Sequence, residues 1–192
     1  MKKAPVLNEK QYKSLLNATK MTRYADRNRM MVVLSYGVGL RACEIAAITV
    51  GDVLDSENNV RETVILAAHQ TKGSKSHSLY LSDSVRKEIA KYIKLHQEFL
   101  TTRKSPLLRS QKGEKMVSHT VQIVLKDLYR KIGLDTCSSH SGRRTFITNL
   151  SEKGVSTRVI QELARHSSLA VTQQYIDVSV DKLRNAVNLV SV

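Results

Sequence analysis

Three separated segments of the sequence contain side chains that could act together on a phosphate ester: a tyrosine, two histidines and several arginines. The segments are GLRACEIAAITVGDV (39–53), HSGRRTF (140–146) and ARHSSLAVTQQY (164–175). Breaking a DNA strand without a metal needs a nucleophile, an acid for the leaving group and positive donors around the pentavalent phosphate. A tyrosine oxygen can be the nucleophile, and planar guanidinium groups match the non-bridging oxygens. The set therefore predicts phosphodiester chemistry.

Each member of the set also has an ordinary structural explanation when it is taken alone. Tyr175 is typical of a packed ring with its hydroxyl at the surface, and Arg41 of a helix-start arginine paired with Glu44. His140 and His166 fit histidines at a helix start and at a turn. The functional interpretation depends on the combination.

The charge of the chain indicates a polyanionic partner. Its 192 residues include 31 Lys and Arg against 17 Asp and Glu, which gives a formal net charge of +14 and a pI near 9.9. Such an imbalance causes self-repulsion unless a polyanion binds, and nucleic acid is the first candidate. We expect basic residues near the N-terminus, such as Lys10, Lys13 and Arg27, to face the phosphate backbone rather than the bases.

Cysteine usage and hydropathy favour a reducing cytoplasm. Cys43 and Cys137 lack the spacing of a zinc site and are too few for a disulfide framework. No apolar run approaches the length of a membrane span, and MKKAPVLNEKQYK lacks the apolar segment of a signal peptide. We expect a nucleoid-associated protein of the cytoplasm that has no membrane contact and binds no metal or other cofactor.

Periodicity and capping signals predict one domain over residues 1–192 that is mainly α-helical with a small antiparallel β-sheet. Asn8 and Gln11 fit a capping box for a first helix, and Arg41 falls at a helix start after a glycine-containing break. Further helices are expected at about 25–36, 83–100, 118–131, 140–153, 156–164, 172–177 and 180–190.

A β-hairpin is expected in the middle of the chain. Its two strands are VRETVILA (60–67) and SHSLYL (76–81), which are rich in β-branched or alternating apolar residues. Lys72 and Lys75 lie at the tip of this hairpin, in a turn that contains Gly73. A short strand around Leu107 and Leu108 could join it.

In their order and separation, the three segments and the hairpin resemble the tyrosine recombinase (phage integrase) family. The motifs of that family are a Gly-Leu-Arg turn with a Glu shortly after the Arg, a Lys in a β-hairpin, His-x-x-Arg, and a His upstream of the nucleophilic Tyr. The resemblance covers nearly the whole chain. It implies the catalytic-domain fold of the DNA breaking and rejoining enzymes.

The resemblance implies an intact active site. Its residues are Arg41, Lys72, His140, Arg143, His166 and Tyr175. Glu44 is then expected to support the helix of Arg41, and Asp52 to close the same segment. Lys75 shares the hairpin turn with Lys72, so the identity of the hairpin lysine stays open.

The implied reaction proceeds through a covalent 3′-phosphotyrosyl intermediate. Tyr175 supplies the attacking oxygen with His140 as its base, and Lys72 protonates the departing 5′ oxygen. The two arginines bind the non-bridging oxygens, and His166 donates to the phosphate. The phosphotyrosyl bond conserves the energy of the phosphodiester, so rejoining needs no ATP and no metal.

The sequence departs from the family at several positions. Gly142 replaces an apolar residue, Arg144 stands where a second His is common, and Arg165 occupies a Gly position. Arg165 bears on the turn geometry, because Gly allows a positive φ at low cost and Arg does not. Few residues precede Arg41, so we expect no N-terminal core-binding domain; a naturally small enzyme and a fragment of a longer one both fit.

The resulting hypothesis is site-specific recombination of double-stranded DNA: integration, excision or inversion by a homo-oligomer, expected to be a tetramer on paired sites. A type IB topoisomerase that relaxes supercoils and a non-catalytic DNA-binding accessory protein remain alternatives. An apolar stripe recurs at helical spacing near the C-terminus, at Ile176, Val180, Leu183, Val187 and Val190. The helix expected over 178–192 could cover this stripe with its own core or dock on a neighbouring protomer.

Overall fold

The structure, a computed structural model, describes the chain except for residues 1–3, 72, 74, 177–182, 185–186 and 191–192. It contains two compact units, Met1–Phe146 and Ile147–Val192, which we call the N-terminal and C-terminal units. The described residues are mainly helical with a two-stranded antiparallel sheet, which confirms the expected fold class. The helix expected over 180–190 lies partly outside the described residues, as does Val180 of its apolar stripe.

The helices follow the expected order along the chain. Those of the N-terminal unit are α1 (Glu9–Lys20), α2 (Ala25–Gly37), α3 (Ala42–Ala47), α4 (Val50–Val53), α5 (Asp83–Leu95) and α6 (Ser118–Lys131). Helix α7 (Ser141–Glu152) begins in this unit and ends in the C-terminal unit, which also contains α8 (Thr157–Ala164) and α9 (Leu169–Gln173). The predicted capping box of Asn8 and Gln11 is present at the start of α1.

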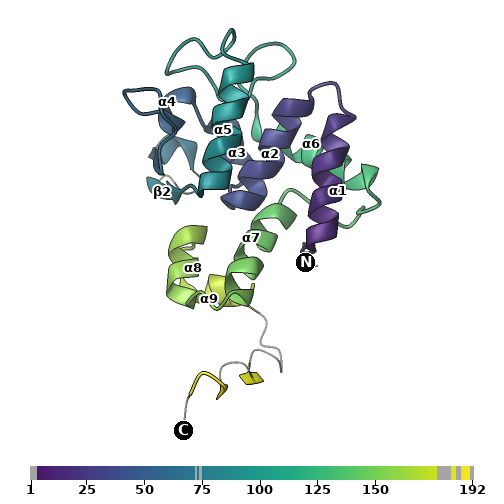
Figure 1. The fold of residues 1–192 in the computed structure, drawn as a ribbon, viewed down its shortest axis with the longest axis vertical. Coiled ribbons are helices and arrows are strands. Elements are labelled where there is room, and N and C mark those ends of the chain that lie inside the picture. The colour runs from purple at the N-terminus through teal and green to yellow at the C-terminus, as the bar shows by residue number, and fades with distance from the viewer. Residues whose placement is uncertain (1–3, 72, 74, 177–182, 185–186, 191–192) are drawn as a thin grey trace. The chain divides into compact units, whose positions relative to one another are not determined.

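Helix α2 is the centre of the N-terminal unit. Every residue of its segment MMVVLSY, from Met30 to Tyr36, is buried. Helices α1, α5 and α6 all pack against it, and Figure 1 shows it between α1 and α5. A helix that is covered on several sides needs apolar residues around most of its circumference, which explains the continuous run. The turn that carries Arg41 follows directly from this rigid element.

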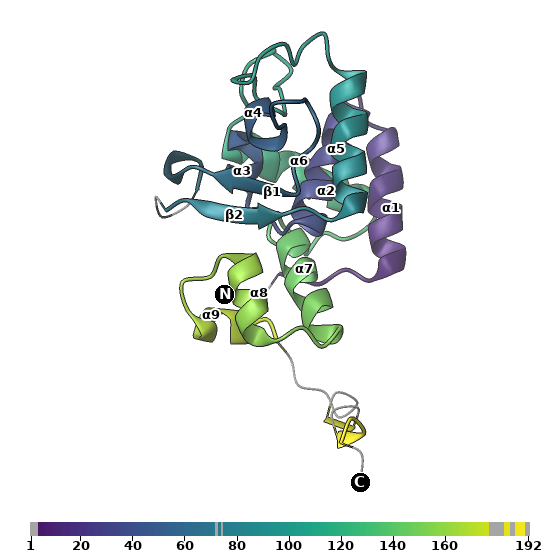
Figure 2. The same ribbon diagram turned by 60° about the vertical axis from the view of Figure 1, so that its left-hand side comes forward.

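The expected hairpin and its glycine-containing turn are confirmed, with shorter strands. Strands β1 (Thr63–Leu66) and β2 (His77–Tyr80) pair in antiparallel register, with Thr63 opposite Tyr80 (Figure 2). A short 3-10 helix, η1 (Ala68–Gln70), follows β1 and precedes the turn.

The strand suggested around Leu107 and Leu108 is wrong. The Leu107 N–H donates to the Ile48 carbonyl oxygen at 3.0 Å, and Pro106 forms an isolated β-bridge with Thr49. The segment therefore contacts the connection between α3 and α4 instead of joining the hairpin. Both leucines are almost completely buried, so core packing accounts for their apolar character without a strand.

Two helices differ in extent from the expectation, and one of them matters for the site. Helix α5 ends at Leu95 instead of continuing to residue 100. Helix α9 covers Leu169–Gln173, whereas we expected a helix over 172–177. Tyr175 consequently lies in the turn after α9, where its N–H donates to the carbonyl of Thr172, three residues earlier. This hydrogen bond spans three residues instead of the four of an α-helix, so the α-helix ends before the tyrosine.

Gly142 marks a close contact between the first turn of α7 and helix α2. A Cβ atom at this position would lie 2.1 Å from Ser35 Oγ and 3.0 Å from the ring of Tyr36. Such distances are far below van der Waals contact, so the packing excludes any larger residue. This explains the departure from the family at position 142 and fixes the start of α7, which carries Arg143.

Candidate active site

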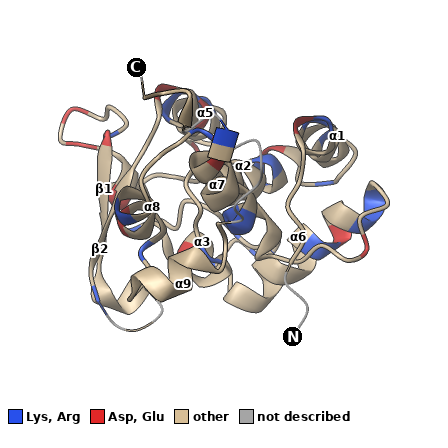
Figure 3. Cartoon of the chain, turned by 90° about the horizontal axis from the view of Figure 1, so that it is seen from below, with Lys and Arg blue, Asp and Glu red and all other residues tan. Residues whose placement is uncertain are grey.

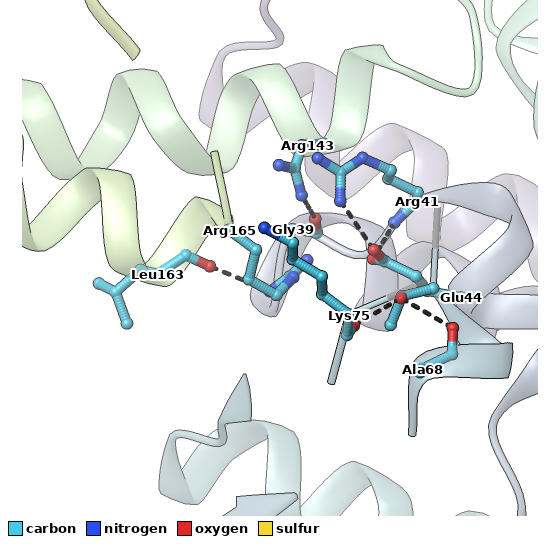
Figure 4. Close-up of polar contacts among 9 residues, drawn as sticks. Gly39, Arg41, Glu44, Ala68, Lys75, Arg143, Leu163 and Arg165 are labelled. Atoms are coloured by element: carbon cyan, nitrogen blue, oxygen red, sulfur yellow. Dashed lines mark hydrogen bonds and ion pairs between the residues drawn. The ribbon is translucent and has the colours of Figure 1, made fainter. Parts of the chain in front are cut away.

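Arg41 directly precedes α3 and is held there by Glu44. The Glu44 side chain is completely buried, with 0% exposure, and its two carboxylate oxygens accept from the backbone N–H and from Nη1 of Arg41, each at 2.8 Å (Figure 4). A buried carboxylate is costly unless it is paired and hydrogen-bonded, and these contacts meet that need. The Arg41 side chain keeps 21% exposure, so it is not closed off from solvent.

Arg143 lies in the first turn of α7 and is tied to the segment that carries Arg41. Its Nη1 donates to the carbonyl of Gly39 at 2.7 Å, and only 4% of the residue is exposed (Figure 4). Gly39 has a φ of +66°, and a Cβ there would meet the ring of Phe146 at 2.6 Å. Position 39 thus requires glycine for two reasons: the positive φ, and the lack of room for a Cβ atom beside Phe146. The structure brings the two predicted arginines to one short turn.

His140 stands just before α7 and is exposed. Its backbone N–H donates to Ser138 Oγ at 3.3 Å, and its carbonyl accepts from the N–H of Arg144 at 2.9 Å. These contacts make His140 part of the turn that opens α7, next to Arg143. Arg41, His140 and Arg143 therefore all belong to the N-terminal unit.

Lys72, the predicted general acid, lies outside the described residues. Around it, the Thr71 hydroxyl lies 2.7 Å from the carbonyl oxygen of Lys75 and 3.1 Å from that of Ala68 in the same loop, and its one hydrogen can be donated to either. Lys75, the alternative hairpin lysine, is exposed. The choice between the two lysines stays a prediction.

Gln70 connects this loop to the helices that follow Arg41, a role that the sequence did not suggest. The residue is 5% exposed, and its Nε2 donates to the carbonyl of Ala47 at 3.0 Å and to Asp52 Oδ2 at 2.7 Å. Its Oε1 accepts from the N–H of Ala67 at 2.8 Å. All hydrogen-bonding atoms of the amide group are engaged, so the base of the loop is fixed to α3 and α4.

His166 and Tyr175 lie together in the C-terminal unit. Their ring centroids are 5.3 Å apart and their planes are inclined by 27°. The two residues meet because the chain turns after α8, forms the short helix α9 and turns again at Gln174. This geometry explains the spacing of the histidine and the tyrosine in the sequence, since one short helix separates them.

Arg165 makes the first of these turns. It is the C-cap of α8 in the left-handed conformation, with a φ of 55°, and its N–H donates to the carbonyl of Glu162. The positive φ that the family's glycine implies is therefore present, although the residue is an arginine. Its Nη1 donates to the Leu163 carbonyl at 3.0 Å (Figure 4), and the residue is 7% exposed.

Tyrosines in the core are unsuited to the role of nucleophile. The hydroxyls of Tyr36 and Tyr129 lie 3.2 Å apart, and burial raises the pKa of both well above the ordinary value. Burial also raises the pKa of Tyr92 to about 12. Their hydroxyls are enclosed in the core and lose a proton less readily than an ordinary tyrosine, whereas Tyr175 is only partly buried.

The described residues offer neither a cluster of metal ligands nor a membrane-spanning helix. Within the described part of the chain, no cluster of three or more His, Cys, Asp or Glu side chains could hold a metal ion. The same residues form no helix with the length and apolar character that crossing a membrane requires.

Sequence comparisons relate the chain to recombinases. The profile of the phage integrase family matches residues 5–182. Tyrosine recombinase XerA of Pyrococcus horikoshii is 31% identical over 88% of this chain and 57% of its own length. Tyrosine recombinase XerD of Corynebacterium glutamicum is 33% identical over 82% of this chain and 50% of its own length. The chain thus spans about half the length of these curated relatives.

Solved structures of recombinases share the fold. The crystal structure of XerA recombinase has a TM-score of 0.76 at 23% identity and covers 97% of this chain, which covers 66% of that one. The Tn1549 transposon integrase, solved in complex with transposon right end DNA, has a TM-score of 0.75 at 19% identity, with 100% of this chain and 68% of that one covered. The confirmed fold is that of tyrosine recombinase catalytic domains.

Replacing Glu44 tests whether its carboxylate anchors Arg41. Glu44→Gln keeps the size of the side chain but removes the charge opposite a largely buried guanidinium. We expect the free energy of unfolding to fall by about 3 kcal/mol, as for other broken buried pairs, measured by urea denaturation. Glu9→Gln is the matched control, because its pair with Lys13 is solvent-exposed and should contribute nothing measurable. Equal stability of the two variants would exclude the anchoring role.

Proposed function

Because the chain belongs to the phage integrase family, we propose that it is a tyrosine-type site-specific recombinase that cleaves and rejoins double-stranded DNA. The observation that carries the proposal is the convergence of Arg41 and Arg143 on one turn, with His166 stacked on Tyr175 in the other unit. Two arginines tied to the same turn suit the non-bridging oxygens of a phosphate. Integration, excision and inversion share this chemistry.

In the proposed reaction the Tyr175 oxygen attacks the scissile phosphorus while its proton passes to His140. A bond forms between phosphorus and the tyrosine oxygen, and the bond to the 5′ oxygen breaks. Lys72 gives a proton to that 5′ oxygen, so a free 5′ hydroxyl leaves. Arg41 and Arg143 stabilise the charge on the pentavalent phosphate, which typically contributes about 3–4 kcal/mol for each well-placed donor.

DNA is the proposed partner because of the charge of the chain and because several related recombinase structures are described as DNA complexes. Figure 3 shows Lys and Arg on α1, α2, α5 and α6, so basic residues are spread over several elements of the N-terminal unit. Such a distribution suits contacts with the phosphate backbone and predicts binding that weakens steeply with salt. Action on cellular DNA would keep the protein with the nucleoid.

We also propose that the protein works as a homo-oligomer, a tetramer on paired sites, and that its C-terminal segment takes part in assembly. Leu183, Val187 and Val190 of the apolar stripe expose 57%, 71% and 71% of their surface. Apolar side chains this exposed favour a partner surface over packing on the chain's own core. Docking on a neighbouring protomer would couple the nearby Tyr175 to assembly.

Tyr175→Phe should keep DNA binding and abolish the covalent adduct, because only the attacking hydroxyl is lost and the ring can still stack on His166. Suicide duplexes nicked beside the scissile phosphate trap the adduct for electrophoresis. An adduct in the Phe variant would refute the assignment of the nucleophile. With the wild type, no adduct would indicate an accessory protein, and failure to join two different duplexes would indicate a topoisomerase.

Lys72→Ala should slow cleavage of an ordinary duplex by about a hundredfold, a typical contribution of a general acid. A substrate with sulfur in place of the bridging 5′ oxygen should restore the rate, since a thiolate leaves without protonation. Lys75→Ala is the matched control from the same turn and should cleave both substrates normally. Rescue of Lys75→Ala instead of Lys72→Ala would move the general acid to Lys75.

Truncation after Asp177 tests the proposed role of the C-terminal segment. The shortened protein should fold cooperatively and bind DNA, yet fail to exchange strands between two duplexes. Thermal unfolding, gel shift and a two-duplex recombination assay give the three measurements. Loss of the cooperative thermal transition would mean that the segment belongs to the core of its own chain.

A further inference from the structure

Thr172 is a buried polar residue at the point where the two proposed catalytic residues of the C-terminal unit meet. It lies in α9 and has 0% exposure. Its Oγ1 is 3.0 Å from Nδ1 of His166, a hydrogen-bond distance. A hydroxyl removed from water needs such a partner, so the contact is part of the packed structure.

The main chain of Thr172 contacts the tyrosine. Its carbonyl oxygen accepts from the N–H of Tyr175 at 3.0 Å. Thr172 therefore binds His166 through its side chain and Tyr175 through its backbone. The stacked rings of these two residues share one anchor.

The backbone of His166 is also fixed, by Gln161 of α8. The His166 N–H donates to the Gln161 carbonyl at 3.1 Å, and Gln161 Nε2 donates to the His166 carbonyl at 3.2 Å. Gln161 is itself 7% exposed. With its backbone held on both sides and Nδ1 engaged by Thr172, the imidazole has little freedom to turn over.

The hydrogen bond at Nδ1 determines what the other ring nitrogen can do. A neutral imidazole carries one hydrogen, on either Nδ1 or Nε2. If a hydroxyl donates to Nδ1, the hydrogen must be on Nε2, which then becomes a donor. Donation from Nε2 is what binding to a phosphate oxygen requires.

We propose that Thr172 is a positioning residue that sets the tautomer of His166: its hydroxyl donates to Nδ1 and so keeps a hydrogen on Nε2 for the scissile phosphate. The inference rests on the proposed function, because it gives His166 the role of phosphate donor. The tautomer itself is a property of the protein without DNA, so it can be measured separately from catalysis.

The tautomer is read from long-range ¹⁵N–¹H correlation spectra of the imidazole, recorded at a pH where the ring is neutral, with His166→Ala to assign its signals. We expect the Nε2–H form in the wild type and in Thr172→Ser, which keeps the hydroxyl. Thr172→Val has nearly the same shape without the hydroxyl, and its spectrum should shift towards a mixture of the two forms. An Nδ1–H form in the wild type would overturn the proposal.

Cleavage of suicide duplexes gives the functional test as a double-mutant cycle. Thr172→Val should slow cleavage by about tenfold, as small errors in the position of a catalytic group do, and Thr172→Ser should stay near the wild type. In a His166→Ala background, Thr172→Val should change the cleavage rate by less than about twofold, because its effect is exerted through the histidine that is already missing. If the two residues acted independently, their effects on the rate would multiply. An undiminished effect of Thr172→Val in that background would refute action through His166.

Controls separate folding and the proposed function from this inference. A cooperative thermal transition in Thr172→Val shows that this variant folds. If Thr172→Val does not fold, the spectrum and the double-mutant cycle of Thr172→Ser decide. A shifted tautomer in Thr172→Ser would contradict the role of the hydroxyl. Absence of any adduct with the wild type would count against the proposed function, whereas the tautomer shift would still be measurable. A normal adduct combined with an unchanged tautomer in Thr172→Val would remove only the inference.

Discussion

The buried ion pair of Glu44 and Arg41 is the interaction on which the arrangement of the proposed site depends. A site for a phosphate must hold several cations close together, in a chain whose net charge is already +14. Glu44 meets this constraint by binding both the backbone and the side chain of Arg41 from a position with no solvent exposure. In a region of low dielectric such a contact orients the guanidinium strongly. These contacts offset part of the cost of burying the acid, so Glu44 and Arg41 stabilise each other.

Neutral groups orient Arg143 and connect the hairpin loop to the helices that follow Arg41. The Gly39 carbonyl accepts from Arg143, and the Gln70 amide ties the hairpin loop to Asp52 and to the Ala47 carbonyl. A carbonyl oxygen that accepts a hydrogen bond from a guanidinium orients this group without neutralising its positive charge. In the proposed reaction the charge of Arg143 acts on the phosphate, and preorganised charge is usually the largest contribution to catalysis.

Local signals in the sequence predicted much of the fold, because their partners lie within a few residues. The capping box of Asn8 and the helix start at Arg41 belong to this class. Side-chain contacts that follow no sequence motif could not be predicted. No motif or periodic pattern links Gln70 to Asp52, or Thr172 to His166. The strand suggested at Leu107 failed for a related reason: an apolar pair indicates burial but does not say which element covers it.

Arg165 shows how a local strain can be maintained by the structure around it. A left-handed conformation costs an ordinary residue about 1–2 kcal/mol, and a glycine would avoid most of that cost. Here the conformation is imposed from both sides, because the N–H of Arg165 caps α8 and the next residue, His166, is bound by Gln161. The turn must be sharp for His166 to reach the ring of Tyr175 across one short helix. The position of the histidine therefore determines the backbone conformation of its neighbour, and the strain at Arg165 is a consequence of building the His166–Tyr175 pair.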